Sequence, residues 1–465
     1  MPSYNFNMII LFVYLINIYF HQNVQHAPTA LSRMDLLHAL TVKEVLEIDD
    51  YHTNTPDKAY YNGHYYSDKA PGTVALALPA FYAGALMLKA IDIPLDSDAG
   101  WLFTSWVACA GSLAIVTSMG AVAMFSWLGR RVPPRIALLI TAGLFLGAAP
   151  LPYATMMFSH SLAVGFIAIA LWTLDRSTGR CDDGGCGLTK VKNWLKHYRY
   201  ELLAGFTLGW TLASEYTAGI IVVGMIAVQL WGQKWRLWPV VLGALPALLL
   251  IPAYSWACLG TPFALPYSYQ ASFPEMKEGV YAIKWPDAET AYNLLFSTER
   301  GLFYWSPFLL LAVVGWFGLF KGKVREVLLF YGLPMIQVAV ISGRVWDWPA
   351  GPTLGPRYLA PMLPLLALPC ALGLMRFPRV GALLVVYSIG LTVLATATDA
   401  CPSYSIGNPL TRLHIPLFLK GQFSYSLGEH VFGLPPYGSF ALYVALVAGG
   451  LWWLWRQLPG AQKNI

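Results

Sequence analysis

The chain has 465 residues, of which 57% are hydrophobic, 14% are aromatic and only 12% are charged, with a formal net charge of +6. Soluble globular proteins have about a quarter of their residues charged, and disordered chains are poor in aromatic residues, so the composition excludes both classes. The basic residues do not gather as a nucleic-acid-binding face requires, and six cysteines are too few for a disulfide scaffold. The composition predicts a protein that crosses a membrane several times.

Apolar segments recur along the whole chain, and a membrane helix needs about 20 such residues. We predict twelve membrane helices, at residues 7–22, 99–127, 134–151, 158–174, 200–213, 217–232, 238–257, 302–320, 327–343, 358–375, 380–397 and 437–456. The first lacks the basic start and the cleavage site of a signal peptide, so we interpret it as an uncleaved anchor. The predicted fold is an all-α polytopic membrane protein with one domain over 1–465. After the first helix come a large loop (23–98), a helical core (99–397) and a last loop and helix (398–465).

The charge of the connections predicts their side of the membrane, because cytoplasmic connections are rich in Lys and Arg. Alternate connections are basic and contain Arg130, Arg131, Arg135, Arg176, Arg180, Lys190, Lys192, Lys196, Arg199, Lys234, Arg236, Lys321, Lys323, Arg325, Arg376, Arg379, Arg456 and Lys463. Most acidic residues fall in the opposite set of connections. We therefore predict a plasma (inner) membrane protein with both termini cytoplasmic. Four long loops, 23–98, 258–301, 344–357 and 398–436, then face the extracytoplasmic side.

Residues 70–92 are apolar but are interrupted by Pro71, Gly72, Pro79 and Gly84. The predicted topology needs all of 23–98 on the outer side, so we interpret this segment as a juxtamembrane helix at the outer interface. The alternative is that it spans the membrane and that the N-terminus is outside.

The first outer loop carries the residues with the clearest chemistry. Its segment 33–47 has a helical pattern. The acidic residues Asp49, Asp50, Asp57 and Asp68 then alternate with Tyr51, Tyr60, Tyr61, Tyr65 and Tyr66, and Lys69 follows directly. Tyrosine rings stack on sugars, carboxylates accept sugar hydroxyls or remove a proton, and lysine neutralises phosphate. The pattern favours a site for a phosphorylated sugar, and an ordinary solvated loop is the alternative.

Several motifs resemble the GT-C membrane glycosyltransferases, most closely the bacterial protein O-mannosyltransferase and lipid A aminoarabinose transferase superfamily. Arg33, the turn Asp49-Asp50-Tyr51 and the segment YYSDKAPG at 65–72 are similar to that family's first outer loop. The segment GPRY at 355–358 is the other sharp match. The resemblance also places 70–92 outside the membrane, in agreement with the charge argument.

The resemblance implies an inverting transfer of a sugar from a polyprenyl-phosphate donor to a lipid, glycan or protein acceptor. Such a transfer needs a general base for the acceptor hydroxyl and cationic help for the departing phosphate. This chain departs from the family at two positions. Ala30 and Leu31 stand where the family has carboxylates before the arginine, and His160 replaces a second carboxylate. These departures also weaken the case for a divalent metal such as Mg or Mn, which prefers several oxygen ligands.

The candidate base is therefore chosen among the loop carboxylates. Asp49, in the turn after the loop helix, is the first candidate, and Asp35, Asp57 and Asp68 are its rivals. We expect the donor phosphate to be bound by Lys69, Arg357 and Arg33. Interfacial snorkelling for Lys69, an interfacial anchor for Arg357 and loop organisation for Arg33 are the alternatives.

The candidate lining of the substrate cavity is Tyr65, Tyr66, His64, His160, Glu215 and Trp348. For Trp348 the alternative is the aromatic belt of the membrane interface. The loop 258–301 is either a lid over the acceptor or an interfacial cover. Cys258 and Cys401 both lie on the predicted outer side and could pair. Cys181 and Cys186 could indicate a metal site, but two thiols without partner ligands favour a solvated loop.

A transporter or flippase of a lipid-linked saccharide is the alternative function. Such a protein needs polar residues along a path through the helices. The sequence has few of them within the predicted spans.

Overall fold

The computed structural model describes residues 4–22, 27–178, 191–231, 237–277, 282–319 and 323–458. The predicted loop cysteines Cys181 and Cys186 lie outside these residues, as do Arg180, Lys190, Lys234, Arg236, Lys321 and Lys463.

Helices make up most of the first half of the chain. Its helices are α1 (Tyr4–Tyr19), α2 (Pro28–Val42), η1 (His52–Asn54), α3 (Gly72–Ala90), α4 (Asp98–Cys109), the π-helical η2 (Ala110–Ala114), α5 (Ile115–Leu128), α6 (Pro134–Leu146), α7 (Pro150–Ala154), α8 (Ser159–Thr178), α9 (Val191–Ser214), η3 (Tyr216–Ala218) and α10 (Gly219–Gln229).

The second half continues the pattern with more breaks. Its principal helices are α11 (Leu237–Leu248), α12 (Leu250–Leu259), η5 (Pro266–Tyr269), α13 (Ala288–Phe296), α14 (Leu302–Trp305), η7 (Pro307–Leu309), α15 (Leu310–Leu319), α16 (Val324–Val327), η8 (Leu328–Gly332), α17 (Leu333–Ser342), η9 (Val345–Asp347), η10 (Arg357–Leu366), α18 (Ala367–Arg376), α19 (Pro378–Thr398), η12 (Leu410–His414), α20 (Ile415–Leu419), α21 (Leu427–His430) and α22 (Pro436–Gln457). Two small antiparallel pairs complete the fold, β1 (His21–Gln22) with β4 (Tyr425–Ser426) and β2 (Lys58–Tyr61) with β3 (His64–Ser67).

Each of the twelve predicted membrane helices coincides with a helical segment, so the all-α prediction is confirmed. Within the described residues, seven helical segments have both the length and the hydropathy of a membrane span, and α3 is one of them. The twelve-span count and the juxtamembrane placement of α3 therefore stay predictions.

The structure corrects two predicted boundaries. The loop helix expected at 33–47 is α2, which begins at Pro28 because proline is favoured in a first helical turn, and which ends at Val42. The helix expected at 302–320 is broken after Trp305, because Pro307 has no backbone N–H to continue it.

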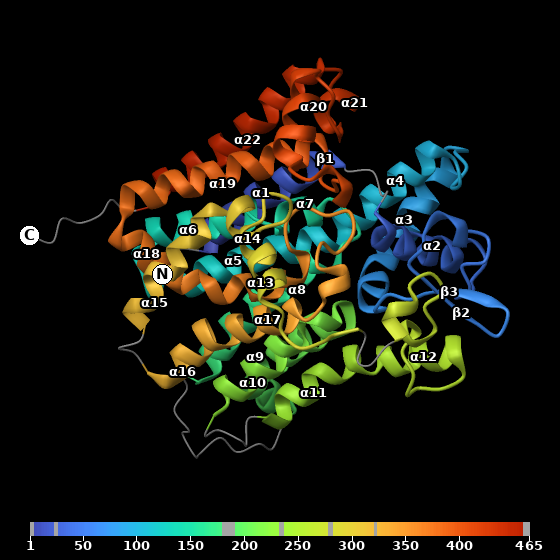
Figure 1. Ribbon diagram of the computed structural model, residues 1–465, viewed down its shortest axis with the longest axis horizontal. Helices are drawn as coiled ribbons and strands as arrows, with labels where there is room; N and C mark the ends of the chain where they lie inside the picture. The colour runs from blue at the N-terminus through green and yellow to red at the C-terminus, as the bar shows by residue number, and fades with distance from the viewer. Residues whose placement is uncertain are drawn as a thin grey trace, which may run out of the picture.

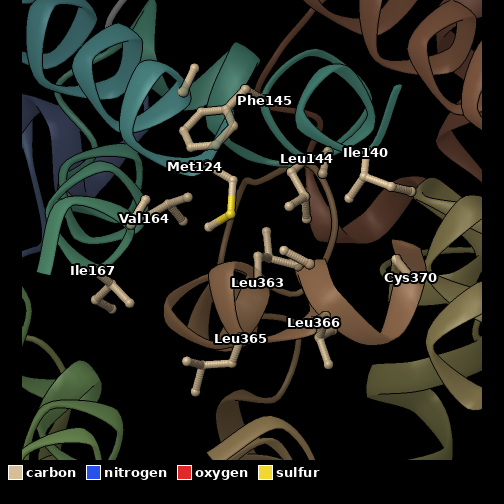
Figure 2. Close-up of a cluster of buried hydrophobic side chains, with 14 of the residues drawn as sticks. Met124, Ile140, Leu144, Phe145, Val164, Ile167, Leu363, Leu365, Leu366 and Cys370 are labelled. Carbon is tan, nitrogen blue, oxygen red and sulfur yellow. The ribbon is translucent and has the colours of Figure 1, made fainter. Parts of the chain in front are cut away.

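The apolar core lies where α5, α6, α8, η10 and α18 meet. Met124, Leu144, Val164, Leu363 and Cys370, one from each of these elements, are completely or almost completely buried and lie together in Figure 2. Side chains in a protein interior pack closely against one another, whether lipid or water surrounds the protein. This core holds the helices that carry the loops described below.

The loop elements gather at one end of the helical body. In Figure 1, α2, α3, β2 and β3 lie together at the right, next to α12, while α15, α16 and α18 lie at the opposite end. The β2–β3 hairpin turns at Asn62 and Gly63, which have φ angles of 50° and 92°. Asn-Gly favours this left-handed turn, and the pairing places Lys58 opposite Ser67, next to Asp57 and Asp68.

Gly72 fixes the distance between the start of α3 and the end of α9. A Cβ atom at Gly72 would lie 2.6 Å from the carbonyl carbon of Ala213 and 2.8 Å from Oγ of Ser214. The absence of a side chain at Gly72 therefore lets the start of α3, three residues after Lys69, pack against the end of α9, directly before Glu215.

We expect Gly72→Ala to destabilise the protein by about 1–3 kcal/mol, because backbone atoms must move to admit the methyl group. Thermal unfolding of the purified protein in detergent would measure the loss. The matched control is Gly390→Ala, an exposed helical position in α19 with nothing within 4 Å of the added atom. Equal melting temperatures for both variants would contradict the close approach.

Candidate active site

A cavity of about 710 Å³ opens among the loops at this end of the molecule. Its lining comes from all four loops predicted to face outward, represented by Asp57, Tyr267, Arg344 and Tyr404. The turns before α8 and after α9 also contribute, with His160 and Glu215. The convergence of these loops confirms that they share one end of the molecule.

Four cations and three carboxylates line the cavity, namely Arg33, Lys69, Arg344, Arg357, Asp57, Glu215 and Asp347. All four cations are less than 9% exposed. Buried charges are costly unless they are paired or hydrogen-bonded, so their partners show what each can still bind.

Arg357 stands at the centre of a hydrogen-bond chain. Its Nη1 donates to the hydroxyl of Thr29 at 3.0 Å, and Thr29 donates to Oδ2 of Asp57 at 2.8 Å. Its Nη2 donates to the hydroxyl of Tyr358 at 3.3 Å, and Tyr358 donates to Oδ2 of Asp347 at 3.1 Å. The guanidinium therefore reaches two carboxylates only through hydroxyls, and its own charge is not directly paired with either.

Lys69 lies between two carboxylates. Its Nζ is 2.9 Å from Oδ2 of Asp57 and 3.2 Å from Oδ1 of Asp68. Burial opposes its charge, but the two carboxylates raise the pKa of Lys69 above its usual value. Lys69 thus clamps the segment that carries Asp57, and Gln270 supports the clamp with a 2.9 Å bond to Oδ2 of Asp68.

Asp57 is held through one oxygen. Burial would raise the pKa of Asp57, but Lys69, Arg357 and the Thr29 hydrogen bond lower it below the usual value, so the carboxylate is ionised at neutral pH. Its backbone N–H donates to Thr55, whose hydroxyl donates to the carbonyl of Pro28 at 2.8 Å. The bonds from Thr29 and Lys69 both end on Oδ2, and within the described residues no hydrogen bond ends on Oδ1. One oxygen of Asp57 is therefore available to a substrate.

Arg33 and Glu215 form a second polar group. Arg33 donates to Ser159 at 3.0 Å, and Ser159 donates to Oε2 of Glu215 at 2.6 Å. Thr217 occupies the other oxygen of Glu215 with its N–H and its hydroxyl. His160 Nε2 lies 3.4 Å from Oε2 of Glu215. Both oxygens of Glu215 have donors, which makes it a poorer base than Asp57.

Six of the thirteen predicted site residues line the cavity: Asp57, Lys69, Arg357, Arg33, His160 and Glu215. Asp68 lies behind Lys69. The remaining predicted residues lie elsewhere, and Trp348 packs against the apolar core rather than lining the cavity.

Asp49 holds the hairpin instead of facing the cavity. Its Oδ1 accepts from the N–H of Tyr65 and its Oδ2 contacts Nδ1 of His64, both at 2.7 Å, and its side chain is 41% exposed. Tyr65 stacks on His52 at a centroid distance of 4.1 Å, and Tyr66 is buried near Glu47. This geometry gives no support to Asp49 as the base or to the two tyrosines as cavity lining.

Asp35 is buried in α2 and accepts a 3.0 Å hydrogen bond from Asn54. Burial raises the pKa of Asp35 to about 7. The folded protein then keeps a proton on Asp35 up to about pH 7, whereas the unfolded chain loses this proton at about pH 4. The free energy of unfolding therefore falls as the pH rises between these values.

We expect Asp35→Asn to raise the free energy of unfolding by about 1–3 kcal/mol at about pH 8 and to have little effect near about pH 4. The Asn oxygen keeps the bond from Asn54, so only the titration is removed. Thermal unfolding at the two pH values measures the difference. If the variant is no more stable than the wild type at about pH 8, ionisation of Asp35 does not lower the free energy of unfolding, and the prediction is wrong.

Several cavity residues were missed from the sequence. Arg344 and Asp347 form an ion pair at 3.1 Å three residues apart, and Thr29, Tyr267 and Tyr358 supply hydroxyls. The three-residue spacing of Arg344 and Asp347, with Asp347 between Trp346 and Trp348, was a usable signal. Thr29 carried none, because its role depends on residues far away in the chain.

Two further predictions can be compared with the structure. Cys258 and Cys401 are buried free thiols, so they do not pair, and Cys401 donates to the carbonyl of Pro352. Among the described residues, no group of three or more His, Cys, Asp or Glu side chains could hold a metal ion.

Comparison with solved structures finds neighbours that cover nearly the whole chain at low sequence identity. ArnT from Cupriavidus metallidurans bound to undecaprenyl phosphate matches 97% of this chain and 75% of its own, with 16% identity and a TM-score of 0.48. The oligosaccharyltransferase of Archaeoglobus fulgidus in the apo form matches 96% of this chain at 12% identity, with a TM-score of 0.45. This chain spans 56% of the latter protein. No protein-family model and no curated protein sequence matches the chain.

Proposed function

We propose that the protein is an inverting membrane glycosyltransferase that moves a sugar from a polyprenyl-phosphate donor to a lipid, glycan or protein acceptor. The proposal places the reaction in the cavity, on the extracytoplasmic face. The observation that carries it is an ionised Asp57 with one free oxygen beside Arg357, which forms no direct ion pair with a carboxylate among the described residues. The donor class comes from the resemblance of the segments at 65–72 and 355–358.

In the proposed reaction the acceptor hydroxyl attacks the anomeric carbon of the donor sugar. Its proton passes to Oδ1 of Asp57 as the new C–O bond forms. The bond from the anomeric carbon to the phosphate oxygen breaks, and its electron pair leaves with the polyprenyl phosphate. Arg357 and Arg33 stabilise the negative charge that develops there. Attack opposite the leaving group inverts the anomeric configuration.

Lys69 supports this chemistry from behind Asp57. The sequence predicted that Lys69 binds the donor phosphate. Because its Nζ already contacts two carboxylates, we assign phosphate binding to Arg357 and Arg33 instead. Lys69 then keeps Asp57 ionised and in place.

A transport function would need charged groups along the helices. Within the described residues, the buried charged side chains lie in the four loops or in turns beside the cavity, apart from Glu201. Glu201 lies near the middle of α9 and accepts a 2.7 Å hydrogen bond from Ser177, at the end of α8 that is farthest from His160. The distribution favours a reaction at one end of the protein over passage through it.

Purified protein in detergent, given polyprenyl-phosphate donors with radiolabelled sugars and extracts of envelope lipid and glycan, tests the function. We expect label to move to an acceptor and free polyprenyl phosphate to accumulate in equal amount. Label that crosses a reconstituted bilayer while still attached to its carrier would instead establish the transporter.

A further inference from the structure

Two hydroxyls separate Arg357 from the carboxylates on either side of it. Thr29 stands between Arg357 and Asp57, and Tyr358 stands between Arg357 and Asp347. A guanidinium usually binds a carboxylate directly and in bidentate fashion. Here neither carboxylate takes that position.

Each hydroxyl has a single proton, and the geometry fixes where that proton points. A guanidinium can only donate, so the hydroxyl oxygen of Thr29 must accept from it. The proton of Thr29 is then directed at Oδ2 of Asp57, 2.8 Å away. That bond requires an acceptor, and Oδ2 also accepts from Lys69. Oδ2 therefore cannot carry a proton, and Oδ1 is left to take one.

From these contacts we propose that Thr29 is a positioning residue that holds Asp57 ionised, with Oδ1 as its proton-accepting atom, by relaying a hydrogen bond from Arg357. The inference rests on the proposed function for its catalytic meaning. Thr29 itself does not touch the reacting atoms. The relay also keeps Arg357 from closing directly onto Asp57, so the guanidinium can still receive a phosphate.

Thr29 is well placed for this role. It lies in the first turn of α2 after Pro28 and is 5% exposed. The charged groups that face Asp57 are Lys69 and Arg357, with Arg33 and Asp68 farther away. Thr29 is a neutral donor among them, so its removal changes the pKa of Asp57 without removing a charge.

The test compares Thr29→Val, which keeps the shape and removes the hydroxyl, with Thr29→Ser, which keeps the hydroxyl. A carboxylate with a lowered folded-state pKa adds stability at neutral pH, and this stability is lost as the pH falls through that pKa. Loss of the Thr29 donor raises the folded pKa of Asp57 and shrinks this contribution. We expect Thr29→Val to melt below Thr29→Ser at neutral pH, and the gap to close in acid.

The same pair is then built in an Asp57→Asn background, where the melting gap should no longer depend on pH. In the transfer assay, Thr29→Val should lower kcat by about 10- to 100-fold and move the acidic limb of the rate profile to higher pH, and Thr29→Ser should restore both. A melting gap that is equal at every pH, or that still varies with pH without Asp57, would overturn the inference. If the variants show the expected melting gap but the wild-type protein transfers no sugar, the proposed function is overturned and the relay still stands.

Discussion

Asp57→Asn should reduce sugar transfer by about 10²- to 10⁴-fold, the range that a positioned general base contributes. Asparagine keeps the acceptor oxygen for Thr29 and Lys69 but cannot take the proton of the acceptor hydroxyl. We expect the loss in kcat, with KM for the donor changed little, because the arginines still bind the phosphate. The rate of label transfer by equal amounts of folded protein measures it.

Asp49→Asn is the matched control for this variant. Asp49 is the carboxylate that the sequence favoured, and its Oδ1 bond to the N–H of Tyr65 survives the substitution. We expect nearly wild-type transfer. If Asp49→Asn is inactive and Asp57→Asn is active, the base assignment is wrong. Activity in both, with loss in Asp347→Asn, would assign the base to the carboxylate on the other side of Arg357.

Arg357→Lys should lower kcat/KM for the donor by about 10- to 1000-fold. Lysine keeps a positive charge, but it cannot donate to Thr29 and Tyr358 and also present a planar edge to a phosphate. Binding of unlabelled polyprenyl phosphate, followed by competition in the same assay, should weaken together with kcat/KM. A loss in kcat alone would indicate that Arg357 acts only on the leaving group.

Arg300→Lys provides the comparison for a buried arginine outside the cavity. Arg300 is fully buried and donates to the carbonyl of Pro402 at 3.0 Å, so its substitution tests for general damage to the loops. We expect a lower melting temperature with donor affinity preserved. Equal losses of donor affinity in the two variants would remove the specific role of Arg357.

The sequence predicted the outline of the site better than its centre. Charge bias between connections identified the four loops whose residues line the cavity, because membrane topology imprints a signal on composition. Which carboxylate of the first loop faces inward depends on the β2–β3 hairpin and on Thr55, and these fold the segment so that Asp57 turns in and Asp49 turns out. The Asn62-Gly63 turn was a readable signal for that hairpin.

Other features could not be obtained from the chain alone. The path from Arg357 to Asp57 passes through Thr29, 328 residues away from the arginine in the sequence. No local pattern encodes such a contact, since it arises only when η10 and the start of α2 meet. The same holds for His160, in the first turn of α8, and Glu215, directly after α9, which meet because these two helices pack against each other.

The most direct test of the account is a structure of the protein with a non-transferable polyprenyl-phosphate sugar bound. We predict the phosphate within hydrogen-bond distance of Arg357, with Oδ1 of Asp57 on the side of the anomeric carbon opposite the phosphate. A donor that binds elsewhere, or that places its sugar away from Asp57 with another carboxylate behind the anomeric carbon, would contradict the account.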